Sequence, residues 1–230
     1  MPLFSSFPDA WRWFVAGGEL VGIDDQRDSF AAGRAQFLSF QAPAIDGRIV
    51  DLARTVRQEL RDVDGLLPLD DDLLHCTIRP AGFQVLAKRR PDDVLREEVA
   101  RIGERAGAAL AGHRPVDITV GPVNVFPDAL VLEVHDRGEL GAMRSALADV
   151  TPAQKPAGWP GAPEYLPHIS LAFFADTSCA AALRERLPAV RELQPVASRV
   201  ARVDFARWWF VGDTREQPEL DVLRSYRFAG

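Results

Sequence analysis

Residues 116–135, VDITVGPVNVFPDALVLEVH, decide the fold class. Alternating apolar and polar residues predict a strand over 116–125, and a second apolar run predicts another over 130–135. Between them stand Pro127 and Asp128, residue types that are typical of a tight turn. A connection this short can join only antiparallel strands. Because helical patterns flank this hairpin, the sequence predicts an α+β (mixed α/β) fold and disfavours a purely parallel, doubly wound sheet.

The segments on either side of the hairpin alternate between strand-like and helix-like patterns. Apolar residues at helical spacing predict helices over 46–62, 138–150 and 177–187 and a helix whose N-cap is Asp92. Shorter apolar runs predict strands over 35–40, 73–85, 166–174 and 199–211. Residues 151–163 contain four prolines and two glycines, which predicts a long surface loop. No GxGxxG or GxxxxGK[ST] loop occurs, so side chains would have to hold any phosphate.

The first 33 residues show no clear helical or strand period. Trp11, Trp13 and Phe30 stand there among glycines and aspartates, so we expect an irregular or part-helical arm that packs on the rest of the chain. The ordered pattern begins only after this segment. We therefore divide the chain into a packing arm, 1–33, and a single domain, 34–230.

Composition restricts the class of protein and its partners. Of the 230 residues, 47% are hydrophobic and 26% charged, as in ordinary globular proteins. The net charge of -6 disfavours general electrostatic binding of long nucleic acid. No run approaches the roughly 18 apolar residues of a membrane helix, and no signal-peptide pattern opens the sequence, so we expect a cytoplasmic protein. The two cysteines, Cys76 and Cys179, fit no metal-binding spacing and are expected to be buried free thiols.

Two short motifs carry the polar chemistry. HCTI at 75–78 and HISL at 168–171 share one order: histidine, apolar residue, hydroxyl residue, apolar residue. On a strand, side chains at positions i and i+2 project from the same face about 6.6 Å apart. Each histidine should therefore project together with its hydroxyl partner while the apolar residues enter the core. Two such copies favour a shared function, because polar groups on an apolar strand cost desolvation free energy.

These paired motifs, in this order on strands between helices, resemble those of the 2H phosphoesterase superfamily, which includes 2′-5′ RNA ligase-like proteins and 2′,3′-cyclic nucleotide phosphodiesterases. The resemblance covers roughly residues 35–211. It implies a bilobal domain in which two similar βα lobes, with antiparallel sheets, face each other across a central cleft. It also implies that His75 and His168 are the catalytic pair and that the hydroxyls of Thr77 and Ser170 bind the phosphate.

The chemistry of imidazole agrees with that implied role. Because its pKa is about 6.5, one histidine can be neutral and accept a proton while the other is charged and donates one. We predict a phosphodiesterase, independent of metals and cofactors, that hydrolyses a 2′,3′-cyclic or 2′-5′ phosphodiester in a nucleotide or RNA end. Two alternatives stay open: 2′-5′ RNA ligation in the reverse direction, and a non-catalytic nucleotide-binding or RNA-binding module. The sequence also leaves open which histidine is the base and what the packing arm does.

Three further residues are candidates for substrate binding. Arg79 continues the alternation of His75 and Thr77 and could clamp a phosphate; the alternative is a surface arginine at the end of a strand. Tyr165 and Trp159 could stack on a nucleobase, or they could pack their loop against the core.

The remaining polar clusters are expected to be structural. The basic run at 88–90 is typical of a solvated loop, and the acidic run at 70–72 of a polar turn without a metal. His113 and His135 are expected to serve the fold. The partner we expect is a small nucleotide or an RNA terminus, with no membrane and no extended duplex, and we expect a monomer.

Overall fold

The computed structural model of the chain describes residues 4–151, 165–210 and 212–229. The helices are α1 (Phe7–Val15), α2 (Ile23–Ala31), α3 (Gly47–Glu59), the 3-10 helix η1 (Asp71–Leu73), α4 (Arg96–Leu110), α5 (Glu139–Ala146) and α6 (Ala180–Val190). The strands are β1 (Gln36–Pro43), β2 (Leu66–Pro68), β3 (His75–Val85), β4 (Asp93–Leu95), β5 (Val116–Phe126), β6 (Ala129–His135), β7 (His168–Phe174), β8 (Val196–Val200), β9 (Arg202–Trp209) and β10 (Glu219–Arg227). The expected hairpin is confirmed, because β5 and β6 pair antiparallel up to Phe126 and Ala129, on either side of the turn.

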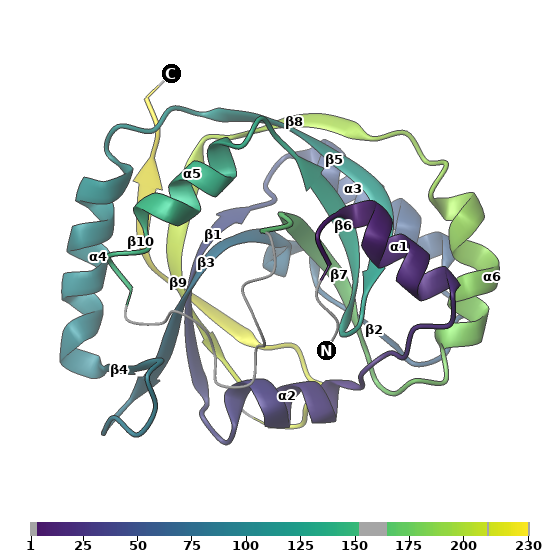
Figure 1. Ribbon diagram of the computed structural model, residues 1–230, viewed down its shortest axis with the longest axis horizontal. Coiled ribbons are helices and arrows are strands. Elements are labelled where there is room, and N and C mark those ends of the chain that lie inside the picture. The colour runs from purple at the N-terminus through teal and green to yellow at the C-terminus, as the bar shows by residue number, and fades with distance from the viewer. Residues whose placement is uncertain (1–3, 152–164, 211, 230) are drawn as a thin grey trace.

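The strands form one curled, mostly antiparallel sheet (Figure 1). Its order is β10-β9-β1-β3-β7-β6-β5-β8, while β2 pairs with β7 and β4 runs parallel to β3. The α+β class is therefore confirmed, whereas the expectation of two separate sheets that face each other is wrong. The first half of the sheet consists of β10, β9, β1 and β3, and the second half of β7, β6, β5 and β8. The halves meet where β3 and β7 pair, and the register between these strands is the single pair Cys76 and Ile169. Strands that share so little hydrogen bonding can diverge on both sides, which lets one sheet curl into a half-barrel.

Helices cover the outside of the curl. Figure 1 shows α4 beside one half of the sheet and α6 beside the other. On the first half, the hydroxyl of Tyr226 in β10 donates to the carbonyl of Gly103 in α4, at 2.6 Å. One apolar core runs through both halves, as its fully buried Phe40, Phe205 and Phe174 illustrate. No helix among the described residues is both long enough and apolar enough to span a membrane.

The N-terminal arm contains α1 and α2 and touches both halves of the sheet. The side chain of Ser6 caps α1 by accepting from the amide of Asp9, at 3.3 Å. The ring of Phe7 in α1 stacks on Phe126 of β5, with centroids 6.3 Å apart. In α2, the amide of Gln26 donates to the carboxylate of Asp128 in the second half, at 2.9 Å. The arm is thus part-helical, as expected, and lies over both halves.

The first half receives the other end of α2. The ring of Phe30 packs edge-on against Phe37 of β1 and Phe83 of β3, with centroid distances of 4.9 and 5.1 Å. After α2, Arg34 forms ion pairs with Asp92 and Asp93 at 2.8 and 2.7 Å. These contacts connect the arm to the strands that follow it in the chain.

The same ion pairs correct one expectation about helix capping. Asp92 does not cap a helix: β4 follows it, α4 begins at Arg96, and the buried carboxylate of Asp92 binds Arg34 instead. Leu95 occupies the N-cap position, where its backbone N–H donates to the carboxylate of Glu98, at 2.8 Å.

Two further expectations about strands need correction. The predicted last strand is two strands, β8 and β9, because Ala201 interrupts the regular pairing and the strands pair with β5 and β1 respectively. β10 follows and was not predicted, since most of its side chains are exposed and show no apolar alternation. The predicted loop at 151–163 lies almost entirely outside the described residues.

Candidate active site

The two motifs lie side by side at the seam of the sheet. His75 opens β3 and His168 opens β7, and the residues after them, Cys76 and Ile169, pair with each other. Both members of this pair are 2% exposed, whereas each histidine is partly exposed. The strand alternation therefore turns both histidines to the face opposite the buried pair. We call the face that carries His75 and His168 the motif face.

Both imidazoles are held in the same way by the chain just before them. Nδ1 of His75 lies 2.7 Å from the carbonyl oxygen of Leu73, and Nδ1 of His168 lies 2.8 Å from that of Leu166. A carbonyl oxygen can only accept, so Nδ1 carries the proton in both rings. When either ring is neutral, its Nε2 is then the basic atom. The two motifs thus share a tautomer as well as a sequence pattern.

The hydroxyl of the first motif touches its own histidine. Oγ1 of Thr77 lies 3.1 Å from Nε2 of His75, and both side chains are partly exposed. Ser170 takes the equivalent place after His168 and is also partly exposed. Each motif therefore presents one ring nitrogen and one hydroxyl on the motif face, an arrangement that can exchange a proton and donate a hydrogen bond.

Burial and charge separate the two histidines. Desolvation lowers the pKa of His75 to about 4, against the hydrogen bond to Leu73, and the positive charge of His168 lowers it further. Desolvation also lowers the pKa of His168, but the bond to Leu166 and the negative charge of Asp128 oppose that change. His75 therefore favours the neutral form, whereas the carboxylate of Asp128 favours the charged form of His168.

Asp128 is a candidate that sequence reasoning missed, because a Pro-Asp dipeptide between two strands reads as a turn. Its partly buried carboxylate accepts from Gln26 of the arm and interacts with the charge of His168. Desolvation raises the pKa of Asp128, and the charge of His168 lowers it. Its distance in sequence from the second motif left no local signal of this interaction.

Aromatic rings flank both histidines, and these contacts were also not predicted. The ring of Trp208 in β9 lies 4.7 Å from that of His75, and the ring of Phe126 in β5 lies 4.8 Å from that of His168. The indole N–H of Trp208 donates to Ser39 and Gln41 of β1, at 3.2 and 3.0 Å. Trp208 is only 5% exposed, so it supports the imidazole and offers little surface to a ligand.

Arg79 does not follow the expected alternation. In the pairing of β1 with β3, Gln41 lies opposite Thr77 and Phe40 lies opposite Arg79, so Ile78 is an extra residue in β3. Such a bulge moves the next side chain to the other face. The Nε of Arg79 donates to the hydroxyl of Thr151, at 2.9 Å. The expectation that Arg79 projects beside Thr77 is therefore wrong, because it assumed that the side chains of β3 alternate without a bulge.

Tyr165 is also placed differently from the expectation. Its hydroxyl donates to the backbone carbonyl of Thr77, at 3.0 Å, and lies 3.9 Å from Sγ of Cys76. The guanidinium of Arg144 lies over the ring, 4.8 Å from its centroid. Tyr165 thus packs against β3, which is the structural alternative weighed above. The other aromatic candidate, Trp159, lies outside the described residues.

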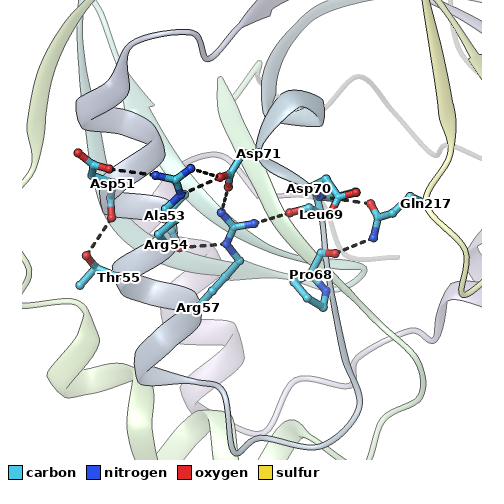
Figure 2. Close-up of polar contacts among 10 residues, drawn as sticks. All are labelled: Asp51, Ala53, Arg54, Thr55, Arg57, Pro68, Leu69, Asp70, Asp71 and Gln217. Atoms are coloured by element: carbon cyan, nitrogen blue, oxygen red, sulfur yellow. Dashed lines mark hydrogen bonds and ion pairs between the residues drawn. The ribbon is translucent and has the colours of Figure 1, made fainter.

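The acidic run before the first motif forms a polar turn, as expected. Asp71 in η1 binds Arg54 and Arg57 of α3, as Figure 2 shows. Over the ranges that the structure describes, no group of three or more histidine, cysteine or acidic side chains is arranged to hold a metal ion. Lys88 of the basic run pairs with Glu98 in α4. Both cysteines are buried free thiols, as predicted.

Comparisons with known proteins give the family of the chain. The chain matches the model of the 2′-5′ RNA ligase superfamily over residues 73–209, more than half of its length. No curated protein matches the sequence.

Solved structures share the fold at low identity. The crystal structure of E. coli LigT complexed with 3′-AMP is 14% identical, with a TM-score of 0.58, over 85% of this chain and 99% of that one. TT0787 of Thermus thermophilus is 15% identical, with a TM-score of 0.53, over 84% and 97%. ATU0111 of Agrobacterium tumefaciens, a conserved protein of unknown function, is 12% identical, with a TM-score of 0.55, over 92% and 97%. Because the family model covers both motifs, the chain belongs to the 2′-5′ RNA ligase superfamily.

Proposed function

We propose that this protein is a metal-independent phosphodiesterase that hydrolyses a 2′,3′-cyclic or 2′-5′ phosphodiester in a nucleotide or an RNA end. The observation that carries the proposal is the pair of histidines, His75 and His168. They open neighbouring strands, share one tautomer and differ in their charged surroundings. Two imidazoles on one face can act on opposite sides of a single phosphorus atom, as an in-line displacement requires.

The surroundings of the histidines suggest their roles. His75, with its low pKa, is the base: its Nε2 accepts a proton from the attacking water. The water oxygen bonds to phosphorus while the bond from phosphorus to a ribose oxygen breaks. His168, beside Asp128, is the acid: its protonated Nε2 gives a proton to that leaving oxygen. Thr77 and Ser170 donate to the non-bridging oxygens, where negative charge accumulates.

Small nucleotides are the substrates that the comparisons favour. E. coli LigT has been solved in complexes with 3′-AMP, ATP, NADP+ and phosphate, so a protein of the same fold binds nucleotides of several sizes. The net charge of -6 supports the same class, since a chain without a general positive surface has little affinity for long duplexes. One phosphodiester held by two hydroxyls and a charged imidazole requires no such surface.

Hydrolysis of 2′,3′-cyclic nucleotides and 2′-5′-linked dinucleotides, measured with EDTA present, tests the proposal. We expect turnover by the wild type and a loss of at least 100-fold in His75→Ala and His168→Ala, since each imidazole contributes about 10²–10⁴-fold. The matched control is His113→Ala, a partly exposed histidine after α4 that should change nothing. Equal rates in all four proteins would exclude two-histidine catalysis.

Two other outcomes have defined meanings. Nucleotide binding without turnover on any substrate would show a non-catalytic binding module. Joining of 2′,3′-cyclic and 5′-hydroxyl RNA ends would show that the same site also works in the ligation direction.

A further inference from the structure

The backbone carbonyl that orients His75 belongs to a short turn. For His75 this carbonyl belongs to Leu73, the last residue of η1, and the ring nitrogen lies 2.7 Å from it. η1 is a single turn with few internal contacts: the amides of Leu73 and Leu74 reach the carbonyls of Asp70 and Asp71 at 3.1 and 3.4 Å. A turn this short needs support from outside to hold one carbonyl in a fixed direction.

That support comes from two arginines of α3 (Figure 2). Arg57 donates to one oxygen of the Asp71 carboxylate, and Arg54 donates to the other at 2.7 Å. The Arg57 side chain is 19% exposed, whereas that of Arg54 is 62% exposed. Hydrogen bonds from Arg57 and Arg54 lower the pKa of Asp71, so the carboxylate stays charged at neutral pH. Arg57 is therefore the better buried of the two partners that hold η1 to α3.

Arg57 also binds Leu69, which lies just before η1 and is hydrogen-bonded to the second motif. A second guanidinium nitrogen of Arg57 donates to the carbonyl of Leu69, and the amide of Leu69 donates to the carbonyl of Leu171, at 2.9 Å. Leu171 is the last residue of the second motif. A third nitrogen, Nε, donates to the carbonyl of Ala53 within α3, at 3.3 Å. One side chain thus fixes both ends of the chain from 69 to 71, which leads directly to Leu73.

We propose that Arg57 and Asp71 are positioning residues that fix the tautomer and direction of the His75 imidazole through the Leu73 carbonyl. The proposal rests on the catalytic role proposed above for His75. When η1 is held, the Leu73 carbonyl keeps the proton on Nδ1 and leaves Nε2 free to accept one. When it is loosened, the neutral ring can also carry its proton on Nε2. In that tautomer Nε2 is not a base, so the population competent for catalysis falls.

The variants remove the support in two ways and have a matched control. Arg57→Met keeps an unbranched apolar stem and removes the guanidinium donors, while Asp71→Asn keeps the size of the side chain and removes its charge. Arg48→Met is the control: it makes the same substitution on the same helix, where Arg48 pairs with Asp46 and is 65% exposed. Arg57→Lys keeps a cationic donor, so it should lose less of the Nδ1-protonated tautomer of His75 and less kcat than Arg57→Met. If Arg57→Met fails to fold, Asp71→Asn alone decides.

Two measurements separate positioning from a merely structural role. Nitrogen-15 NMR of labelled histidine reports the tautomer of each ring without any substrate. In the wild type and Arg48→Met we expect His75 protonated on Nδ1; in Arg57→Met and Asp71→Asn we expect a mixture of tautomers, with the His168 signals unchanged. Cyclic nucleotide hydrolysis should show kcat lowered about 10-fold or more in these two variants, with KM changed less than about twofold.

The outcomes decide the two proposals separately. A lower melting temperature with unchanged His75 tautomer and kcat would overturn the positioning role and leave Arg57 structural. No activity in the wild type would overturn the proposed function, while the tautomer signals would still decide whether Arg57 and Asp71 orient His75. A change in the His168 tautomer equal to that of His75 would also overturn the proposal, because the effect would then not pass through Leu73.

Discussion

Cys76 of β3 lies directly opposite Ile169 of β7, and this one pair constitutes the register between the two strands. Each of these residues follows a motif histidine, so the pair fixes how His75 and His168 lie relative to each other. Both side chains are buried in the apolar core on the face opposite the histidines. The spacing of the proposed catalytic groups therefore depends on packing at this pair.

Shortening the side chain of Ile169 should lower the stability of the fold. We expect Ile169→Ala to lower the free energy of unfolding by about 2–5 kcal/mol, the usual cost of removing a buried aliphatic side chain. The matched control is Ile45→Ala, at a position that is 73% exposed. Urea unfolding measures the difference between the two variants. If Ile169→Ala lowers the free energy of unfolding no more than Ile45→Ala does, packing at the pair of Cys76 and Ile169 is not important for stability.

The motif hydroxyls should matter for catalysis and little for folding. Removing one donor to the developing charge costs about 10²–10³ in kcat, so Thr77→Val and Ser170→Ala should each lose that much. Thr119→Val, at an exposed position of β5, is the control. Steady-state hydrolysis of a cyclic nucleotide measures the effect. Wild-type kcat in both motif variants would remove the hydroxyls from the mechanism.

The low pKa of His75 predicts how the free energy of unfolding changes with pH. In the unfolded chain this histidine binds a proton near its ordinary pKa of 6.5, but in the folded protein only near about 4. The unfolded state therefore binds more protons between these values, and the free energy of unfolding should fall as the pH falls from about 6.5 to about 4.

Urea unfolding at a series of pH values, compared between the wild type and His75→Gln, isolates this contribution. The variant should show a shallower fall over that window, because one linked proton is missing. Identical slopes would mean that His75 has the same pKa in both states.

Asp128 should set the pH at which the proposed acid is active. Its negative charge favours the protonated form of His168, so Asp128→Asn should lower the pKa of His168 and move the alkaline limb of the kcat profile to lower pH. The charge of His168 also interacts with His75. The control is Asp117→Asn, whose side chain is 88% exposed. An unmoved alkaline limb in Asp128→Asn would argue against His168 as the acid.

The ion pairs of Arg34 should be important for stability. Its side chain is 10% exposed, and those of Asp92 and Asp93 are 1% and 2% exposed. Arg34→Met leaves two buried carboxylates without this partner, and breaking a buried pair costs about 3–5 kcal/mol. Thermal unfolding should show a large drop in melting temperature, compared with little change in Arg12→Met, an arginine that is 75% exposed. Equal melting temperatures would contradict a stabilising role.

Local patterns were predictable from the sequence, and long-range ones were not. The hairpin of β5 and β6 and the two motif strands follow from periods and turn residues within a few positions of each other. The position of Arg79 depends on a bulge against β1, which the sequence of β3 alone does not reveal. Asp128 meets Gln26 and the charge of His168 only after folding. The single curled sheet likewise depends on one pairing between distant strands.

The contacts of the arm have a mechanical consequence. In the pairing of β3 with β7 the register is the single pair of Cys76 and Ile169, so contacts away from this pair also help to hold the two halves of the sheet together. The arm spans them at a distance from this pair, from Gln26 on Asp128 to Phe30 on Phe37. The arm therefore connects the two halves in addition to the strand pairing, and through Gln26 it also holds Asp128, whose charge acts on His168.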